Sequence, residues 1–210
     1  MPIIILGGGG HSKVLVEALL AGSVAIAGIV DPDPALIGCS ILGVSVLGGD
    51  DEVLRYFHGE VRLVNGLGST GLPQKRKDIF ELFSLQGYTF VTVVHPSAVV
   101  ASDVQLDEGA QIMAGAVIQP GSRLGRNAIV NTNASVDHDC QIGNHVHLAP
   151  GVTLSGEVTI GDSVHIGTGA TVIQGIRIGS GSLIAAGAVV INDIPAGSIA
   201  MGVPAKVVRK

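Results

Sequence analysis

Residues 160–190 read IGDSVHIGTGATVIQGIRIGSGSLIAAGAVV, and an aliphatic residue stands at every sixth position of this stretch. The period extends back to Val94, because every sixth position from Val94 to Val190 is Val, Leu or Ile, and the position four residues after each is small or branched. A six-residue unit with one large and one small inward residue forms one side of a triangular prism, and three units close one coil of a parallel β-helix. The sequence therefore predicts about five stacked coils over residues 94–190, each rising about 4.8 Å.

The composition agrees with such a repeat. Glycine accounts for 31 of the 210 residues, Trp is absent, and aromatic residues make up only 3%. Repeated turns packed around small and branched side chains give this profile, because glycine adopts a positive φ without a Cβ clash. A stack of coils leaves open strand edges at both ends. We therefore expect residues 191–210 and the N-terminal region to cover the two ends.

Charge and cysteine content exclude several classes of protein. The net charge is −5 and no cluster of Lys and Arg is present, which argues against a nucleic-acid partner. Two cysteines, Cys39 and Cys140, indicate no disulfide framework and favour a reducing compartment. The apolar stretch at residues 3–6 is too short for a signal peptide or a membrane span. We expect a cytoplasmic protein with no membrane partner.

The first 93 residues follow a different pattern, in which strands alternate with helices and so predict a parallel sheet of βαβ units. About 90 residues correspond to one mononucleotide-sized half of a doubly wound fold. We expect an α/β, Rossmann-like domain at 1–93, an all-β helix domain at 94–190 and a C-terminal cap at 191–210. The expected strands of the first domain are 2–7, 24–31, 61–69 and 89–95, and the expected helices are 13–22, 50–57 and 75–87.

One corner of the repeat carries charge, in the stretch NTNASVDHDCQIG at residues 131–143. In the register above Val136 and Cys140 point inward, so His138 and Asp139 occupy the corner between them and face outward. An ordinary surface histidine is the alternative interpretation. A neighbouring carboxylate can fix the tautomer of an imidazole and stabilise the imidazolium, and a neutral imidazole suits a general base near neutral pH. Cys140, pointing inward, is a poor candidate nucleophile.

Three stretches in this order, IIILGGGGHSKV, DHDCQIG and GVPAKVV, together resemble the bacterial sugar acyltransferases of the left-handed β-helix type. Nucleotide-amino-sugar N-acetyltransferases and sialic acid O-acetyltransferases are the most similar members. The resemblance implies direct transfer from acetyl-CoA, with His138 as general base, Asp139 as the acidic residue that follows it, and the N–H of Gly156, one coil further along, as oxyanion donor. It also implies a homotrimer with active sites between subunits.

The same resemblance places acetyl-CoA along the outside of the β-helix, with His147 near the thioester carbonyl. The candidate contacts for the rest of acetyl-CoA are Gly167, Ala185, Ala186, Gly187 and, near a phosphate, Lys206. His147 and His165 stand in one column and His145 is close by, but zinc needs at least three ligands in a suitable set. We predict no metal site and interpret His145 and His165 as surface residues.

The stretch Gly7–Ser12 follows a strand and opens a helix, so its N–H groups form an anion-binding end. Asp31 closes the second expected strand and Asn65 ends the third, at the same edge of the sheet. The resemblance assigns this crevice to the nucleotide of a sugar nucleotide. The implied contacts are Gly9, Gly10, His11, Asp31 and Asn65.

The sequence thus predicts an acetyl-CoA-dependent N-acetyltransferase that acts on a nucleotide-linked amino sugar, a 4-amino-4,6-dideoxy sugar, for surface glycan biosynthesis. O-acetylation of a sugar hydroxyl, as in sialic acid, stays the alternative. Two rivals come from other classes, namely a β-helix that only binds nucleotide sugars and a zinc hydratase.

Overall fold

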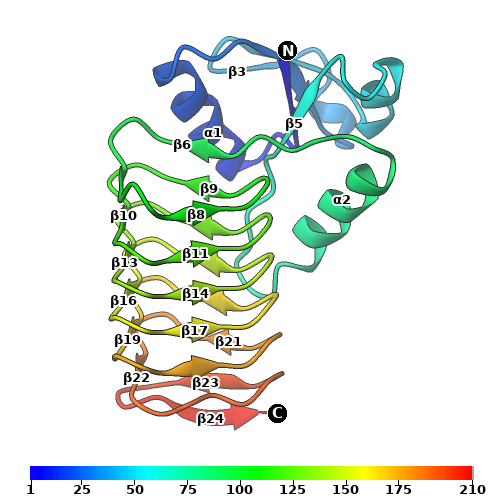
Figure 1. Ribbon diagram of the computed structural model, residues 1–210. Coiled ribbons are helices and arrows are strands. Elements are labelled where there is room, and N and C mark those ends of the chain that lie inside the picture. Colours follow the sequence, from blue (N-terminus) through cyan, green and yellow to red (C-terminus); the bar gives the residue numbers. More distant parts are fainter. Residues whose placement is uncertain (210) are drawn as a thin grey trace.

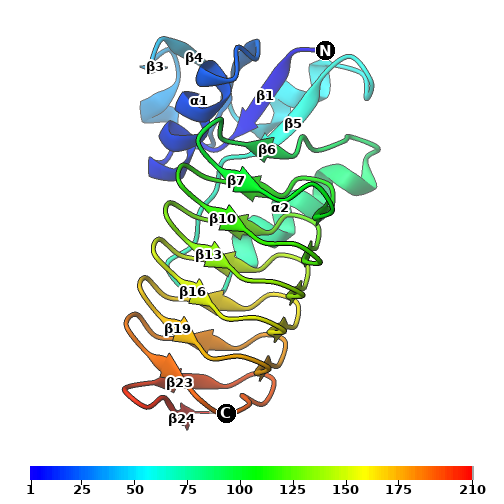
Figure 2. The same ribbon diagram turned by 60° about the vertical axis from the view of Figure 1, so that its left-hand side comes forward.

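The computed structural model describes residues 1–209. A small α/β unit lies at one end of a long prism of stacked coils, and the helix α2 (Gln74–Leu85) lies beside the prism (Figures 1 and 2). The chain ends at the opposite end of the prism. The domain boundaries at residues 93 and 190 stay predictions.

The α/β unit is built on a five-stranded sheet in the order β3-β4-β2-β1-β5, parallel except for the antiparallel pair β3–β4. Ile3 and Ile5 of β1 pack toward α1, while Ile4 and Leu6 pack on the side of α2, so β1 is buried on both faces. The elements are β1 (Ile3–Leu6), α1 (Gly10–Ala21), β2 (Ile26–Val30), η1 (Pro34–Leu36), β3 (Ser40–Ile41), β4 (Val44–Gly48), η2 (Asp50–Arg55) and β5 (Arg62–Asn65), followed by α2.

Several local expectations for this unit were wrong. The helix α1 begins at Gly10, so residues 10–12 are helical rather than loop, and residues 50–55 form a 3₁₀ helix. The β3–β4 hairpin was not expected. The segment 89–95 forms no fourth strand of this sheet, because only Phe90 bridges to Leu63, and Val93–Val94 (β6) joins the prism instead.

Three sheets form the faces of the prism, and over residues 93–190 neighbouring strands are parallel and lie 18 residues apart in the sequence, as in Val117 with Ser135. Face 1 contains β7 (Val99–Val100), β10 (Val117–Ile118), β13 (Ser135–Val136), β16 (Thr153–Leu154), β19 (Thr171–Val172) and β22 (Val189–Val190). Face 2 contains β8 (Gln105–Leu106), β11 (Arg123–Leu124), β14 (Gln141–Ile142), β17 (Thr159–Ile160) and β20 (Arg177–Ile178). Face 3 contains β6 (Val93–Val94), β9 (Gln111–Ile112), β12 (Ile129–Val130), β15 (His147–Leu148), β18 (His165–Ile166), β21 (Leu183–Ile184), β23 (Ile199–Met201) and β24 (Lys206–Arg209).

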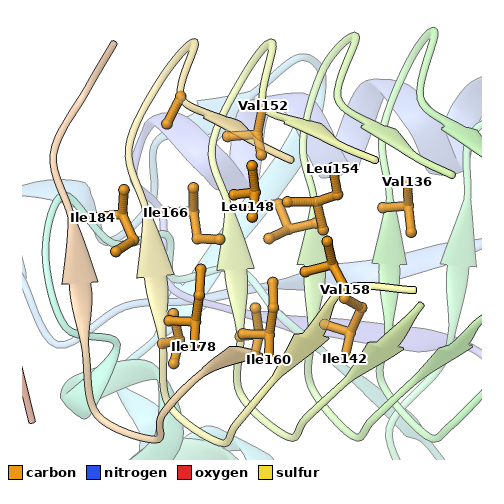
Figure 3. Packing of buried hydrophobic residues seen from close by; sticks show 14 of the residues in the cluster. Val136, Ile142, Leu148, Val152, Leu154, Val158, Ile160, Ile166, Ile178 and Ile184 are labelled. Carbon is orange, nitrogen blue, oxygen red and sulfur yellow. The ribbon is translucent and has the colours of Figure 1, made fainter. Parts of the chain in front are cut away.

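The expected inward positions fill the prism (Figure 3). Val136, Leu148 and Leu154 are at most 1% exposed and point toward the axis from faces 1 and 3. Full burial of such a side chain stabilises the fold by about 1.5–3 kcal/mol, so the aliphatic column holds the coils together. The first coil is the exception, because Val94 is 42% exposed where no further coil covers it.

Side chains at the edge between faces 2 and 3 form a second ladder along the prism. Asn144 accepts the N–H of Arg126 through Oδ1 at 2.9 Å, and Asp162 accepts the N–H of Asn144 at 2.7 Å. Ser180 Oγ continues the ladder by accepting the N–H of Asp162 at 3.0 Å. Each bond joins neighbouring coils and pairs a backbone donor that the sheets leave free.

Both ends and one face of the prism are covered by other segments. Residues 67–73 run from the α/β unit down along face 3, as far as contact with Leu183, and α2 then returns beside the prism (Figure 1). At the far end β23 pairs in parallel with β21, and β24 pairs antiparallel with β23. Within residues 1–209 no helix has the length and apolar character needed to cross a bilayer.

Candidate active site

His138 stands at the edge between faces 1 and 2, where the chain turns from β13 into β14. Its side chain is 46% exposed, and its Nδ1 lies 2.9 Å from Oδ2 of Asp139. Asp139 adopts a positive φ of 58° at this corner. A carboxylate only accepts hydrogen bonds, so His138 Nδ1 carries the proton and Nε2 presents its lone pair.

The charges around His138 raise its pKa above the ordinary histidine value. The hydrogen bond to Asp139 is the largest cause, and the charges of Asp137, Asp139 and Glu157 add to it, against a smaller opposing effect of desolvation. The carboxylates therefore stabilise the imidazolium that forms when His138 accepts a proton.

Gly156 lies directly under the ring of His138, one coil further along. A Cβ at position 156 would lie 2.5 Å from Cε1 and Nε2 of His138, so only glycine leaves room for the ring in this position. Within residues 1–209 no acceptor is present for the Gly156 N–H. A free backbone donor and a basic nitrogen thus lie side by side at an exposed edge.

A second group of histidines lies on face 3, and we call His11, His147 and His165 the face-3 histidine group. The rings of His147 and His165 are 5.0 Å apart edge to face, and the ring of His11 is 6.4 Å from that of His147. His147 is 4% exposed and His165 6% exposed, because residues 67–73 cover them. Ser69 from this covering segment lies against both rings.

The environment of the face-3 histidine group favours neutral imidazoles. Burial lowers the pKa of His11 to about 4, and the charge of Arg76 acts in the same direction. Burial lowers the pKa of His147 well below its usual value, with His165, His11 and Arg76 adding smaller effects. Burial also lowers the pKa of His165. These three side chains therefore resist protonation at neutral pH.

A buried cation joins the α/β unit to the prism. Arg76 of α2 is 1% exposed and donates to the carbonyl oxygens of Asn65 at 2.9 Å, of Leu67 at 2.8 Å and of Asn127 at 3.3–3.4 Å. Among residues 1–209, no carboxylate is a partner of its guanidinium. Burial lowers its pKa to about 9, so the group stays charged at neutral pH.

A cavity of about 570 Å³ opens at the carboxyl ends of β1 and β2. Asp31 is held there by the N–H of Gly8 at 2.6 Å and the N–H of Asp33 at 2.8 Å. Burial, followed by the charges of Asp31 and Asp51, raises the pKa of Asp50. The cavity is lined by Gly7, Asp31, Pro32, Asp50, Leu67, Lys75, Asp78, Ile79 and Leu82.

Comparisons with known proteins agree with this architecture at both ends of the chain. Residues 121–156 and 157–192 match the family described as bacterial transferase hexapeptide, six repeats, and residues 2–83 match the PglD N-terminal domain. A perosamine N-acetyltransferase from Caulobacter crescentus is 39% identical, with a TM-score of 0.93 over 100% of this chain and 98% of that chain. The chain belongs to the bacterial hexapeptide-repeat sugar acetyltransferases.

Other solved structures extend the comparison. The acetyltransferase domain of PglB from Neisseria gonorrhoeae is 36% identical, with a TM-score of 0.91 over 99% of both chains. WeeI from Acinetobacter baumannii, at 24% identity and a TM-score of 0.87, covering 99% of this chain and 100% of that chain, shares the fold. No curated protein sequence matched the chain. The expected left-handed β-helix behind an α/β domain is confirmed, and the chain is an enzyme of the acyltransferase class.

The residues expected to contact acetyl-CoA lie in two parts of the prism. Gly167, Ala185 and Gly187 lie at the edge between faces 3 and 1, with Ala186 and Gly187 exposed. Gly167 is buried, and a Cβ there would lie 2.5 Å from the backbone nitrogen of Ala186, so close packing of the coils explains this glycine. Lys206 begins β24, with its side chain exposed at the far end of the prism.

Some expected site residues lie elsewhere than predicted. Asn65 is 1% exposed and its side chain bonds to Arg76, Asn127 and the N–H of Leu67, so it holds the junction together rather than lining the crevice. His11 joins the face-3 histidine group, with Nε2 at 2.8 Å from Oε1 of Gln111. Gly9 and Gly10 are exposed at the start of α1, and Gly7 rather than these two glycines lines the cavity.

The interpretation of His145 and His165 as surface residues was wrong. His145 is 8% exposed, packs edge to face on Phe80 of α2 and lies 3.0 Å from Nδ2 of Asn127. Burial is the largest cause that lowers its pKa. Within the described 1–209, no cluster of three or more His, Cys, Asp or Glu side chains could hold a metal ion.

Four further residues around face 3 were not predicted from the sequence, namely Ser69, Arg76, Gln111 and Asn131. Three of them act through contacts between the α/β unit and the prism, which the repeat alone does not reveal, namely Ser69, Arg76 and Gln111. Asn131 contacts His147 within the prism. The available signal was polarity at outward positions of face 3, since Gln111, His147 and His165 stand in one column there.

Proposed function

We propose that this enzyme transfers an acetyl group from acetyl-CoA to the amine of a nucleotide-linked amino sugar, a 4-amino-4,6-dideoxy sugar, for glycan biosynthesis. The observation that carries the proposal is the imidazole of His138, half exposed beside Gly156 and bonded to Asp139 at 2.9 Å. Two relatives support the choice of substrates. The Caulobacter enzyme is described in complex with CoA and GDP-perosamine, and the PglB domain in complex with acetyl coenzyme A.

His138 would act as the general base of a direct transfer. Its Nε2 takes the N–H proton as the amine nitrogen attacks the thioester carbon, and Asp139 stabilises the imidazolium through Nδ1–H. The C–S bond then breaks, and the leaving thiolate takes the proton back from His138. Cys140 takes no part, because it is 0% exposed inside the prism and burial raises its pKa to about 11.

The N–H of Gly156 would donate to the oxyanion of the tetrahedral intermediate. The donor is fixed by the coil and has no acceptor among residues 1–209, so it costs no rearrangement when charge develops on the carbonyl oxygen. Because the ring of His138 lies over the same glycine, the base and the oxyanion donor are close enough to act on the same thioester carbon.

The nucleotide would occupy the cavity at the carboxyl ends of the strands. Gly9 and Gly10 at the start of α1 offer N–H groups to the phosphates, as helix N-termini do for anions. Asp31, anchored by Gly8, offers its remaining acceptor positions to ribose hydroxyl or base N–H donors. The apolar side chains of Leu67 and Ile79 complete a slot for the base.

A homotrimer would complete the site. His138 stands at the edge between faces 1 and 2, whereas Gly167, Ala185 and Gly187 stand at the edge between faces 3 and 1, with the whole of face 1 between them. One acetyl-CoA reaches both sets when edges of neighbouring subunits meet. Face 1 suits burial against a partner because its outward residues are uncharged, namely Val99, Val117, Ser135, Thr153, Thr171 and Val189. We place the enzyme in the cytoplasm, where acetyl-CoA and sugar nucleotides occur, with Lys206 near a phosphate of acetyl-CoA.

A panel of nucleotide-linked amino sugars, assayed with acetyl-CoA for release of free thiol, tests the proposal. We expect turnover with a 4-amino-4,6-dideoxy sugar nucleotide and an amide product by mass spectrometry. Free sialic acid serves as the hydroxyl acceptor, and activity with it alone would replace N-acetylation by O-acetylation. Binding of nucleotide sugars without thiol release from any acceptor would show a binding module instead.

A further inference from the structure

The helix α2 stands between two cavities of the molecule. One of its faces lines the cavity at the carboxyl ends of β1 and β2, which we call the nucleotide cavity. Another face lines a second cavity of about 640 Å³ against the edge between faces 2 and 3 of the prism (Figure 1). His145, from that edge, lines the second cavity, and its Nε2 is 3.7 Å from Oε1 of Glu81 of α2. A contact at His145 therefore acts on the helix that forms a wall of the nucleotide cavity.

A chain of buried amides fixes the orientation of the imidazole of His145. Oδ1 of Asn65 accepts the N–H of Leu67 at 3.2 Å, and Nδ2 of the same side chain donates to the carbonyl oxygen of Arg76 at 2.8 Å. Nδ2 of Asn65 also donates to Oδ1 of Asn127 at 3.2 Å. The NH₂ of Asn127 is therefore the group that faces Nδ1 of His145, at 3.0 Å.

The hydrogen bond from Asn127 requires a neutral ring. Nδ1 of His145 accepts this bond and so carries no proton, which places the one N–H of the ring on Nε2, toward Glu81. Rotation of the Asn127 amide would not accommodate a proton on Nδ1, because its NH₂ would then face the NH₂ of Asn65. Protonation of His145 therefore leaves two donors face to face at one point of the chain.

The charges that face His145 come from α2 and from the next coil. Burial is the largest effect and lowers the pKa of His145. Glu81 of α2 and Asp162 of the next coil act to raise it, whereas Lys77 and Arg76 of α2 act to lower it. An imidazole released from this contact would return to the ordinary pKa of about 6.5. The stabilising contribution of the contact is therefore complete above about pH 6.5 and is lost as the pH falls toward the lowered pKa.

We propose that neutral His145, held by Asn127, is a positioning residue that keeps α2 against the prism and so fixes a wall of the nucleotide cavity, and that a proton on its ring releases this contact. The identity of the ligand in the nucleotide cavity rests on the proposed function, whereas the contact between His145 and α2 does not.

Amide hydrogen exchange of α2 in the full chain tests the contact without any ligand. His145→Asn keeps an acceptor oxygen near the position of Nδ1 and cannot be protonated, and comparison at one pH cancels the intrinsic exchange rates. At about pH 5.5, one unit below the ordinary histidine pKa, α2 of the unaltered protein should open about tenfold more often than α2 of His145→Asn. At about pH 8 the two proteins should agree, and α1 should agree at both values. Equal exchange of α2 at the lower pH, or an equal change in α1, overturns the proposal.

The tautomer provides a direct check on the chain of amides. Long-range ¹H–¹⁵N correlation on the full chain labelled with ¹⁵N-histidine distinguishes Nδ1–H from Nε2–H rings, and His145→Asn assigns the signal. We expect Nε2–H for His145 at neutral pH. An Nδ1–H signal would mean that the NH₂ of Asn127 does not face the ring, and it overturns the proposal.

Nucleotide affinity provides a readout of the positioning role, with GDP and UDP as probes in calorimetry at about pH 8. His145→Ala leaves the NH₂ of Asn127 unpaired and should raise the Kd of the probe about threefold to tenfold, up to the effect of one buried hydrogen bond. His145→Asn should stay within about twofold of the unaltered protein. An unchanged Kd in His145→Ala overturns the positioning role. If neither probe binds the unaltered protein, the proposed nucleotide site fails, while hydrogen exchange still decides the contact.

Discussion

His138 and His147 both point away from the axis of the same prism, yet their surroundings are opposite. His138 is half exposed among three carboxylates, which raise its pKa, whereas His147 is buried beside two imidazoles and near Arg76, and its pKa is lowered. The repeat gives both side chains the same outward direction, so the repeat does not explain the difference. The difference comes from the segment 67–73, which covers face 3 and leaves the edge between faces 1 and 2 open.

In the proposed mechanism proton transfer belongs to the exposed edge at His138, whereas the buried imidazoles of face 3 keep one protonation state. A base must exchange its proton during every turnover, and an exposed imidazole beside carboxylates can do so. A positioning group benefits from a fixed tautomer, which burial and directed hydrogen bonds provide. The following experiments test how far the two histidines differ.

His138→Asn should have the largest effect. Removal of the base should lower kcat about 10²–10⁴-fold, because that is the usual contribution of general base catalysis. The thermal midpoint should hardly change, since exposed substitutions alter stability by about 0.5 kcal/mol or less. His147→Asn, at the buried site, should lower the midpoint clearly. Steady-state kinetics and thermal melts measure both, and near-full activity of His138→Asn would remove the mechanism.

Arg76→Met tests the junction that keeps face 3 covered. Three backbone carbonyl oxygens would lose their buried donor, and the free energy of unfolding should fall by about 3 kcal/mol. Urea denaturation measures the change. Lys75→Met, an exposed neighbour on the same helix, is the matched control and should stay within about 0.5 kcal/mol of the unaltered protein. Equal stability of the two variants would show that the cation contributes nothing to the junction.

Gly156→Ala displaces His138 without removing it. The added Cβ would lie 2.5 Å from the ring, so the imidazole must move away from the Gly156 N–H, while the backbone conformation allows alanine. We expect kcat/KM to fall by about one to two orders of magnitude, as small misplacements of catalytic groups do. Gly22→Ala, where the nearest atoms are 3.5 Å away, is the control. Unchanged activity would mean that the ring position is not critical.

Asp139→Asn should shift the pH dependence of kcat/KM. In the unaltered enzyme the rate falls as pH falls through the raised pKa of His138, because an imidazolium cannot accept a proton. Loss of the carboxylate lowers that pKa, so the acidic limb should move to lower pH. Asp137→Asn, which removes a charge effect smaller than the hydrogen bond to Asp139, should move it less in the same direction. A shift of the limb to higher pH would contradict the assigned role.

The inside of the prism was predictable from the sequence because a six-residue period has one structural solution. The inward column from Ile112 to Val190 was therefore correct, as was the outward corner at His138. The covering of face 3 by residues 67–73 was harder to predict. The six-residue period distinguishes inward from outward side chains, but it does not indicate which segment packs on the outward ones. A signal was nevertheless present, because outward positions on face 3 include Ile129 and Leu183, whereas those on face 2 are all Gln, Arg or Thr.

The missed β3–β4 hairpin has a different cause. Its turn places Leu42 at φ 49° and Gly43 at φ 83°. Tight hairpins of this kind are usually marked by Asn-Gly or Asp-Gly, because a large apolar residue is uncommon in the left-handed region. The stretch around Leu42 therefore lacked the usual turn signal, and no pattern of residues indicated the hairpin.

The 18-residue register of the strands limits how this architecture can change its reach. Loss or gain of a single residue would rotate every later side chain off its face, whereas loss or gain of a whole coil would keep each face intact. The separation between the cavity of the α/β unit and a given coil of the prism can thus vary only in steps of about 4.8 Å. Related enzymes that use a longer or shorter acyl donor should differ from this chain by whole coils. The segment that corresponds to residues 67–73 should be longer or shorter to match.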